Sequence, residues 1–393
     1  MTIREAKRAA VLIVGGGVIG SSVAYHLAAA GVRSVIVIER DPSYAQASSA
    51  LSASSIRQQF TTPACIRMSQ YGFHFLRHIA EYLDIGEGID VSLTERGYLY
   101  LADAAHAPAL EAALDVQRAH QVPVRRLDPP GLRQDFPWLR VDDLVLGAFG
   151  TAGEGWFDGY GLLQAFRRKA RQLGVAYVSD EAVDLIRSGS RVTGVRTARS
   201  GDFYAQVVVN AAGPRAANVA AWGGFTLPVA PERRCIFVFS CPEPPRDLPL
   251  VIDPTGVYVR PEGRHFITGG PASMTKDSDP FALTVDYHQF DDFIWPVLAA
   301  RVTAFERIKM TRAWAGLYEM NQFDHNALIG WVPGVEGFML ATGFSGHGMQ
   351  HSPAAGRGVA ELITTGRFTT LDLTTFSPDR LVRNQPIVEL NIT

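Results

Sequence analysis

Gly15, Gly17 and Gly20, near the start of the chain, have the spacing of a turn that binds phosphate groups. In the pattern G-x-G-x-x-G the first glycine permits a tight turn, the second lets the backbone approach a pyrophosphate, and the third lets a helix pack closely on a strand. Val18 and Ile19 stand between the last two glycines. Glycine-rich turns are common, so the pattern indicates a dinucleotide site only between a buried strand and a helix.

The flanking residues supply that context. Residues 10–14 form a short apolar run typical of a strand buried on both faces, 21–30 have a helical pattern, and 34–39 are a second buried strand. The helix N-terminus offers N–H donors and a positive dipole end to phosphates. Glu39, at the end of the second strand, is placed to bind ribose hydroxyls and disfavours a 2′-phosphate. We therefore predict a βαβ unit that binds a dinucleotide; the alternative is a plain tight turn with a solvated glutamate.

A second glycine-rich segment, with Gly343, Gly346 and Gly348, lies near the other end of the chain. Such a loop indicates close approach of the backbone to a ligand. A helix should follow it, with Ser352 as its N-cap and Pro353 as its first residue. The positive end of that helix would favour electron acceptance by a redox cofactor, so this segment favours a flavin dinucleotide over NAD.

The rest of the chain predicts an α/β fold with a Rossmann-like nucleotide-binding domain and an α+β second domain built on a large antiparallel sheet. Residues 60–120 have a mostly helical pattern, 161–173 form an amphipathic helix, and 228–314 alternate as strands rich in aromatics. The nucleotide domain is expected to comprise 1–85, 145–225 and 325–393, and the substrate domain 86–144 and 226–324.

Composition excludes several classes of function. The net charge of −2 provides no field for nucleic acid or an acidic membrane surface, and no apolar stretch reaches the roughly 20 residues of a membrane span. The charged start followed by an apolar run superficially resembles a secretory signal, but glycines interrupt the run. Cys65, Cys235 and Cys241 lack the spacing of a metal site. We expect a cytoplasmic protein without a metal.

Several motifs in combination, over nearly the whole chain, resemble the D-amino-acid oxidase superfamily. The resemblance is to its branch of sarcosine oxidases and D-amino-acid dehydrogenases, and most of all to FAD-dependent oxidoreductase domain-containing proteins. The motifs are the turn at 15–20, Glu39-Arg40, SSALS at 48–52, NAAGP at 210–214, AGLYE at 315–319, GFSGHG at 343–348 and the tail from Phe376.

The resemblance implies an FAD cofactor and a set of contacts with it. Ser48, Ser49 and Ser52 would lie along the pyrophosphate and isoalloxazine, and Val183 would meet the adenine through its backbone. The full predicted set is Gly15, Gly17, Val18, Ile19, Gly20, Glu39, Arg40, Ser48, Ser49, Ser52, Val183, Ala212, Gly213, Gly343, Gly346, His347, Gly348, Met349 and Gln350. Family members that tether their flavin use a cysteine where this chain has Gly316, or a histidine near Ser52, so we expect non-covalent FAD.

The resemblance also implies oxidation of the C–N bond of an amino acid or N-alkylated amino acid, with hydride transfer to flavin N5 and hydrolysis of the imine. A secondary amine with a carboxylate, such as sarcosine or an N-carboxymethyl compound, is the preferred substrate, and free D-amino acids come next. Oxygen or another molecule accepts the electrons. Three alternatives remain: a D-amino-acid dehydrogenase with a non-oxygen acceptor, a non-catalytic flavoprotein assembly factor, and an NAD-dependent dehydrogenase.

The family's carboxylate-binding residues are replaced in this chain. The lysine of monomeric sarcosine oxidase aligns with Gln350, and the arginine of D-arginine dehydrogenase aligns with Tyr318. Arginine suits bidentate carboxylate recognition, which makes Arg57 and either Arg233 or Arg234 candidates. Because side chains alternate along a strand, only one of the adjacent pair can face the pocket, and the alignment favours Arg234.

The remaining candidates are aromatic or basic. Tyr258, Tyr318 and His347 are expected to line the reaction site, although each tyrosine could equally belong to the core. His347 and His351 have the spacing of a helical metal site, but the glycines make a helix there unexpected and no third ligand is evident. Lys276 aligns loosely with the lysine that activates oxygen in sarcosine oxidase; a solvated turn lysine is the simpler interpretation.

Overall fold

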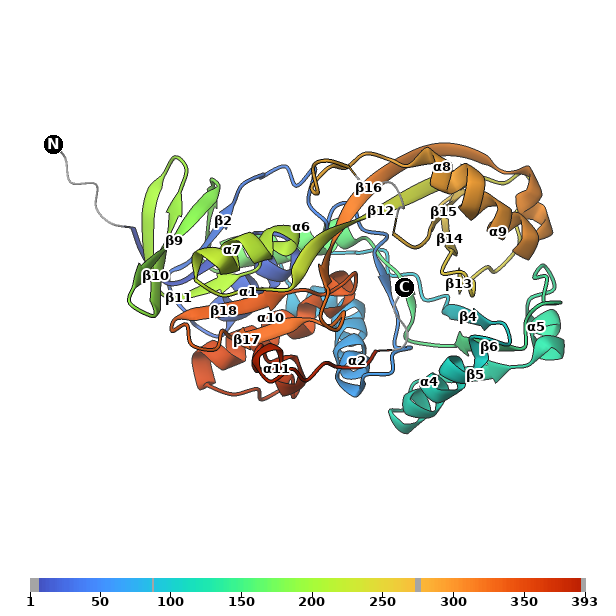
Figure 1. Cartoon of the computed structure of the whole chain (residues 1–393), viewed down its shortest axis with the longest axis horizontal. Coiled ribbons are helices and arrows are strands. Elements are labelled where there is room, and N and C mark those ends of the chain that lie inside the picture. Colours follow the sequence, from blue (N-terminus) through green and yellow to red (C-terminus); the bar gives the residue numbers. More distant parts are fainter. Residues whose placement is uncertain (1–6, 87, 273–276, 390–393) are drawn as a thin grey trace.

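Two eight-stranded sheets organise the chain (Figure 1). The structure is a computed structural model that describes residues 7–86, 88–272 and 277–389. The first sheet and its helices form one half of the molecule and the second sheet the other half, with two long strands running between them (Figure 1). Lys276 lies outside the described residues.

The first sheet has the strand order β17-β18-β11-β1-β2-β8, and a β9–β10 hairpin extends it at β11. Its strands are β1 (Lys7–Val14), β2 (Val35–Glu39), β8 (Ala176–Ser179), β9 (Ala182–Ser188), β10 (Arg191–Thr197), β11 (Gly201–Asn210), β17 (Leu328–Trp331) and β18 (Phe338–Thr342). β1 pairs in parallel with both β2 and β11, and Leu12 and Ile13 in its centre are fully buried. The apolar runs of the sequence are thus the central strands of a parallel sheet.

Helices from distant parts of the chain cover this sheet. They are α1 (Val18–Ala29), α2 (Pro63–Arg77), α3 (Ile79–Tyr82), α6 (Gly159–Gln172), α7 (Ala216–Trp222), α10 (Gly348–Thr365) and α11 (Asp379–Val382). α1 packs directly on α10, where a Cβ at Gly356 would lie 2.2 Å from the Ser22 hydroxyl oxygen. The Ser22 hydroxyl donates to the carbonyl of Ser352 at 2.7 Å. The two helices that follow the glycine-rich segments therefore lie side by side.

The second sheet has the order β16-β12-β15-β14-β13-β4-β6-β5, and its pairs are antiparallel except β4–β13. Its strands are β4 (Tyr98–Ala102), β5 (Val124–Leu127), β6 (Leu146–Gly150), β12 (Val229–Ser240), β13 (Leu250–Ile252), β14 (Tyr258–Glu262), β15 (His265–Gly269) and β16 (Lys309–Asn321). A short pair, β3 (Ser55–Ile56) and β7 (Gly155–Trp156), stands apart from both sheets.

Helical segments complete the second half, around a core that includes Phe237, Phe239 and Phe305. They are α4 (Ala107–Ala119), α5 (Pro129–Asp135), α8 (Tyr287–Gln289), η2 (Phe290–Ile294), α9 (Trp295–Arg301) and η3 (Thr303–Arg307); η1 (Gly213–Arg215) and η4 (Thr374–Phe376) belong to the first half. In the described ranges, no helix has the length and apolarity needed to cross a membrane.

The predicted fold class is confirmed, and two details of the sequence prediction are wrong. The stretch 60–120 is mostly helical as predicted, but the prediction omitted the strand β4, which pairs with β13 and β6. α10 begins at Gly348 rather than after Ser352, so Pro353 lies inside the helix. Proline lacks an N–H for the Met349 carbonyl, and the Ser352 hydroxyl donates to that carbonyl instead, at 2.9 Å.

The boundary at residue 145 also differs from the sheet pairing. β6 belongs to the second sheet, although the sequence assigns the residues from 145 onward to the nucleotide domain. The division of the chain into domains otherwise stays a prediction.

Candidate active site

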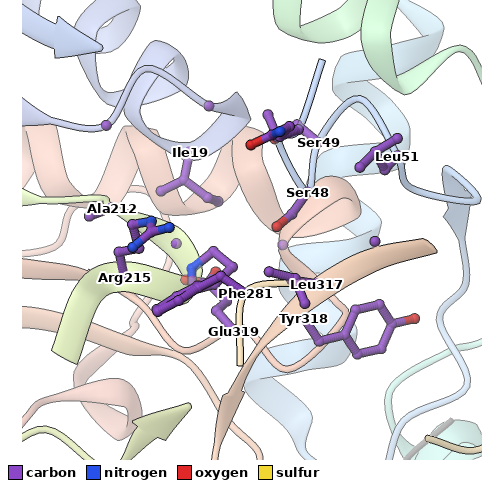
Figure 2. A pocket seen from close by; sticks show the side chains of 18 of the residues that line it. Ile19, Ser48, Ser49, Leu51, Ala212, Arg215, Phe281, Leu317, Tyr318 and Glu319 are labelled. Atoms are coloured by element: carbon purple, nitrogen blue, oxygen red, sulfur yellow. The ribbon is translucent and has the colours of Figure 1, made fainter. Parts of the chain in front are cut away.

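A cavity of 780 Å³ lies between the glycine turn of the first sheet and the β12–β16 pair of the second. This volume is in the range of ligand pockets, roughly 300–1,000 Å³. The predicted ligand-binding residues that line it are Gly15, Gly17, Val18, Ile19, Glu39, Arg40, Ser48, Ser49, Ser52, Val183, Ala212, Gly213, Arg234, Tyr258, Tyr318, Gly346, Gly348 and Met349. Residues from both ends of the chain therefore share one cavity (Figure 2).

The glycine turn leaves no room for side chains. Gly15 has a φ of +97°, and a Cβ there would lie 2.3 Å from the carbonyl oxygen of Ala211. Gly20 does not line the cavity; a Cβ there would lie 1.9 Å from the carbonyl oxygen of Gly15. The hydroxyl oxygen of Ser49 accepts a hydrogen bond from the N–H of Val18 at 3.0 Å, in the first turn of α1. The turn thus brings backbone to the edge of the cavity.

Glu39 fixes this turn at the end of β2. Its two carboxylate oxygens accept the N–H of Gly16 at 2.7 Å and of Asp41 at 2.8 Å. Burial raises the pKa of Glu39, and these two hydrogen bonds oppose the rise. Each oxygen retains a second lone pair for a ribose hydroxyl.

The opposite end of the cavity is built by β12, β14 and β16. Arg234 on β12 lines the cavity, and its guanidinium carbon lies 5.1 Å from the ring centroid of Tyr318 on β16. Arg233 is not among the lining residues and forms an ion pair with Asp277. Tyr258 on β14 also lines the cavity, and burial raises the pKa of its phenol, which therefore stays protonated at neutral pH.

Gly346 places the glycine-rich loop against Tyr318. Its φ is +92°, and a Cβ there would lie 2.5 Å from the Tyr318 ring. Gly343 has a φ of +72° and does not line the cavity. Gly348 and Met349, the first residues of α10, do line it, so the positive end of this helix faces the cavity.

Arg57, His347 and Gln350 form a separate buried group, and none of the three is among the residues that line the described cavity. The backbone N–H of Arg57 donates to Oε1 of Gln350 at 2.8 Å, and its Nη2 lies 3.2 Å from Nε2 of His347. Burial lowers the pKa of His347, so the neutral ring can accept this hydrogen bond. The roles predicted for the three residues stay predictions, and the geometry favours Arg234 over Arg57 as a ligand-binding arginine.

His347 and His351 lie one turn apart, because α10 starts at Gly348 and the expectation of a loop there is wrong. Nε2 of His351 lies 3.0 Å from the Ser69 hydroxyl, and burial lowers the pKa of His351 to about 3. No cluster of three or more metal-ligating His, Cys, Asp or Glu side chains occurs within 7–86, 88–272 and 277–389.

Glu319 is a cavity residue that the sequence reasoning did not single out, although it lies in the AGLYE motif. Its Oε2 accepts the Thr342 hydroxyl at 2.6 Å, and its Oε1 accepts the N–H of Phe344 at 3.4 Å. Burial raises the pKa of Glu319 to about 7 in spite of these donors. A carboxyl group that titrates near neutrality therefore stands beside the glycine-rich loop.

This raised pKa predicts a pH dependence of stability. The folded protein retains the Glu319 proton at pH values where the unfolded chain, with a pKa of about 4.5, has lost it. The free energy of unfolding should therefore fall as the pH rises from about 4.5 to about 7. Glu319→Gln should remove this part of the decrease, as urea unfolding of the FAD-free protein at pH 5 and pH 8 would measure. Equal pH dependence in the two proteins would contradict the assignment.

Arg215 and Phe281 are two further lining residues outside the predicted set. Arg215 directly follows the NAAGP motif, which is the signal that could have indicated it. No sequence pattern indicates Phe281, because it lies outside any helix or strand.

The residues present fit a flavin dinucleotide. The turn at Gly15 and Gly17 brings backbone to one end of the cavity, and the first turn of α10 faces the other. Glu39 stands at the end of β2 beside the turn, where an acid would bind a ribose, and the glycines leave space that side chains would fill. Fold and cavity together define the class as a dinucleotide-binding flavoprotein.

Residues 10–362 match the model of the family described as "DAO: FAD dependent oxidoreductase", and the chain belongs to this family. It is 40% identical over 424 residues to FAD-dependent oxidoreductase domain-containing protein 1 of Xenopus laevis, an alignment that covers 98% of this chain and 85% of that protein. Mitochondrial sarcosine dehydrogenase of Mus musculus is 26% identical, over 91% of this chain and 40% of that protein. L-proline dehydrogenase from P. horikoshii superposes with a TM-score of 0.86 at 25% identity, covering 97% of this chain and all of that one.

These comparisons confirm the predicted family and the FAD cofactor. The protein is an FAD-dependent oxidoreductase of the amino-acid oxidase and dehydrogenase class. The non-covalent attachment of FAD stays a prediction, for which the absence of a cysteine at Gly316 is the support.

Proposed function

We propose that this protein oxidises the C–N bond of an amino acid or N-alkylated amino acid, and that it prefers secondary amines that carry a carboxylate. Sarcosine and N-carboxymethyl compounds belong to that class. The observation that carries the proposal is the Arg234 guanidinium, which lines the cavity beside Tyr318 and the glycine-rich loop. An arginine held against an aromatic ring is suited to binding a carboxylate.

The hydrogen bonds of Arg234 leave donors for a substrate. Its Nε and Nη2 lie 2.9 and 2.7 Å from Oε1 of Glu232, and its Nη1 donates to the carbonyl of Gly270 at 3.0 Å. A guanidinium has five N–H groups, so one remains on each terminal nitrogen. Two such donors match the two oxygens of a carboxylate, while Glu232 and Gly270 fix the orientation of the guanidinium.

Bound FAD supplies the hydride acceptor for this chemistry. The chain's own residues bind and orient the substrate, which is the main demand of a hydride transfer. Arg234 would hold the carboxylate, and the protonated phenol of Tyr258 could donate a second hydrogen bond. The Tyr318 ring would limit how the substrate lies beside Gly346.

The names of two relatives support the same substrate class. L-proline dehydrogenase and sarcosine dehydrogenase are named for proline and sarcosine. Both compounds are secondary amines with a carboxylate on the adjacent carbon. The identity of the electron acceptor, oxygen or another molecule, is a separate part of the proposal.

An anaerobic substrate panel tests the proposal. The yellow holoprotein would be mixed without oxygen with sarcosine, proline, iminodiacetate, glycine and D-alanine, and flavin absorbance would be followed. Bleaching by a secondary amine supports the proposal, whereas bleaching by D-alanine alone would favour a D-amino-acid dehydrogenase. No bleaching by any amine would overturn it and favour a non-catalytic flavoprotein. Peroxide release in air would identify oxygen as the acceptor.

Arg234→Gln should raise the substrate concentration needed for half-maximal flavin reduction by about 10- to 100-fold, the equivalent of a charged hydrogen bond worth about 1.5–3 kcal/mol. FAD content should not change. Arg233→Gln, on the opposite side of the same strand, is the matched control and should behave as wild type. Arg57→Gln tests the other candidate: a larger effect there than at Arg234 would move the carboxylate site to the buried group around His347.

A further inference from the structure

One wall of the cavity contains a contact between an arginine and an aromatic ring. The guanidinium carbon of Arg215 lies 3.7 Å from the ring centroid of Phe281, and both residues line the cavity. Figure 2 shows the two side chains next to each other. Arg215 belongs to the η1 turn of the first half, and Phe281 to the connection that precedes α8 in the second half. The contact therefore joins the two halves over the cavity.

The Arg215 guanidinium has no hydrogen-bonding or ion-pair partner in the part of the chain that the structure describes. It stacks on the ring of Phe281. Arg40 repels its charge, whereas Glu181 and Asp279 attract it. Partial burial lowers the pKa of Arg215, yet a guanidinium stays charged at neutral pH. The five N–H groups of the Arg215 guanidinium are therefore available to an acceptor in the cavity.

Phe281 is held in place by its own turn. The N–H of Phe281 donates to Oδ1 of Asp279 at 2.9 Å, and the N–H of Ala282 donates to the carbonyl of Asp279 at 3.1 Å. This turn fixes the ring against one face of the guanidinium. The edge of a stacked guanidinium, which carries the N–H groups, remains available to an anion.

We propose that Arg215, held flat by Phe281, binds the diphosphate of FAD from the side opposite α1, and that the pair forms a clasp between the two halves of the protein. A diphosphate carries negative charge on both sides, and the α1 N-terminus can satisfy only the side that faces it. Arginine binds phosphate oxygens bidentately through its planar fork. The proposal rests on FAD binding and is independent of the substrate proposed above.

Release of FAD from the holoprotein provides the test. After dilution, the recovery of flavin fluorescence gives the rate of FAD dissociation. Arg215→Gln should accelerate release by about 10- to 100-fold, as loss of a charged hydrogen bond implies. Phe281→Leu should accelerate it by about 3- to 10-fold, through loss of the cation–π contact. The double variant should release FAD no faster than Arg215→Gln alone, because Phe281 acts through Arg215.

Riboflavin, which carries no phosphate, separates this role from general damage to the fold. Binding of riboflavin to the deflavinated protein should change by less than about twofold in Arg215→Gln, within the range of a neutral surface substitution. Phe293→Leu, at a partly exposed aromatic outside the cavity, is the control and should release FAD as wild type does. Unchanged FAD release in Arg215→Gln would overturn the proposal, as would equal losses of FAD and riboflavin affinity or additive effects of the two substitutions.

Discussion

Gly20→Ala should yield a protein that has lost most of its affinity for FAD. The new Cβ would lie 1.9 Å from the carbonyl oxygen of Gly15 and 3.3 Å from a methyl group of Ile13. Neither the backbone of the turn nor the buried strand can move away cheaply, so α1 must shift from the phosphate-binding position. Overpacking of this severity costs about 3 kcal/mol, roughly a 100-fold loss in affinity. The ratio of flavin to protein absorbance and titration with FAD would measure it.

Gly88→Ala is the matched control, because a Cβ at Gly88 meets no atom within 4 Å. This variant should bind FAD as wild type does. Circular dichroism would show whether Gly20→Ala retains the fold, and FMN titration would show whether the loss concerns the dinucleotide. Full flavin content in Gly20→Ala would contradict the role assigned to the turn.

Arg380→Leu should cause a large loss of stability. Nε and Nη2 of Arg380 bind the two carboxylate oxygens of Asp324 at 2.7 and 3.0 Å, and both side chains are buried. Arg380 also donates to the carbonyls of Phe376 and Asn326. Removing the guanidinium leaves a buried carboxylate without its cation, which costs about 3–5 kcal/mol. Urea unfolding monitored by circular dichroism would give the free energy of unfolding.

Two comparison variants separate the buried ion pair from the helix that carries it. Arg383→Leu replaces an exposed arginine directly after α11 and should change the free energy of unfolding by less than about 0.5 kcal/mol. Arg380→Leu combined with Asp324→Asn should be more stable than Arg380→Leu alone, because no uncompensated charge remains. A loss below about 1 kcal/mol in Arg380→Leu would show that water reaches Asp324.

The nucleotide-binding half of the site could be predicted because its signals are local. The spacing of Gly15, Gly17 and Gly20 and the acid at Glu39 are set by backbone geometry within one βαβ unit. The conformation of Gly15 and the contact of Gly20 with its carbonyl agree with that reasoning. Position in the family motifs extended it to Ser49, Gly346 and other residues that line the cavity.

Features that depend on distant partners could not be predicted in the same way. β4 is a strand because β13 and β6 pair with it, which its own apolar residues do not reveal. The start of α10 was misjudged because Ser352 and Pro353 are typical of a helix N-terminus, whereas the Ser352 hydroxyl here compensates for the missing proline N–H. Arg57 and Arg234 were both candidates in the sequence, and the structure adds only that Arg234 lines the cavity whereas Arg57 does not.

The pairing of β12 with β16 has a consequence for how such a protein can change its chemistry. Arg234 sits opposite Gly316 on this two-stranded ribbon, and Tyr318 and Glu319 follow on the same partner strand. Arg234 and Tyr318, which would help to choose the substrate, are thus carried by one strand pair, with Tyr258 on the nearby β14. The turn predicted to bind the nucleotide belongs to the other half of the molecule. Substitution of a few residues on β12 and β16 should therefore change which amine is accepted without changing how the nucleotide is bound.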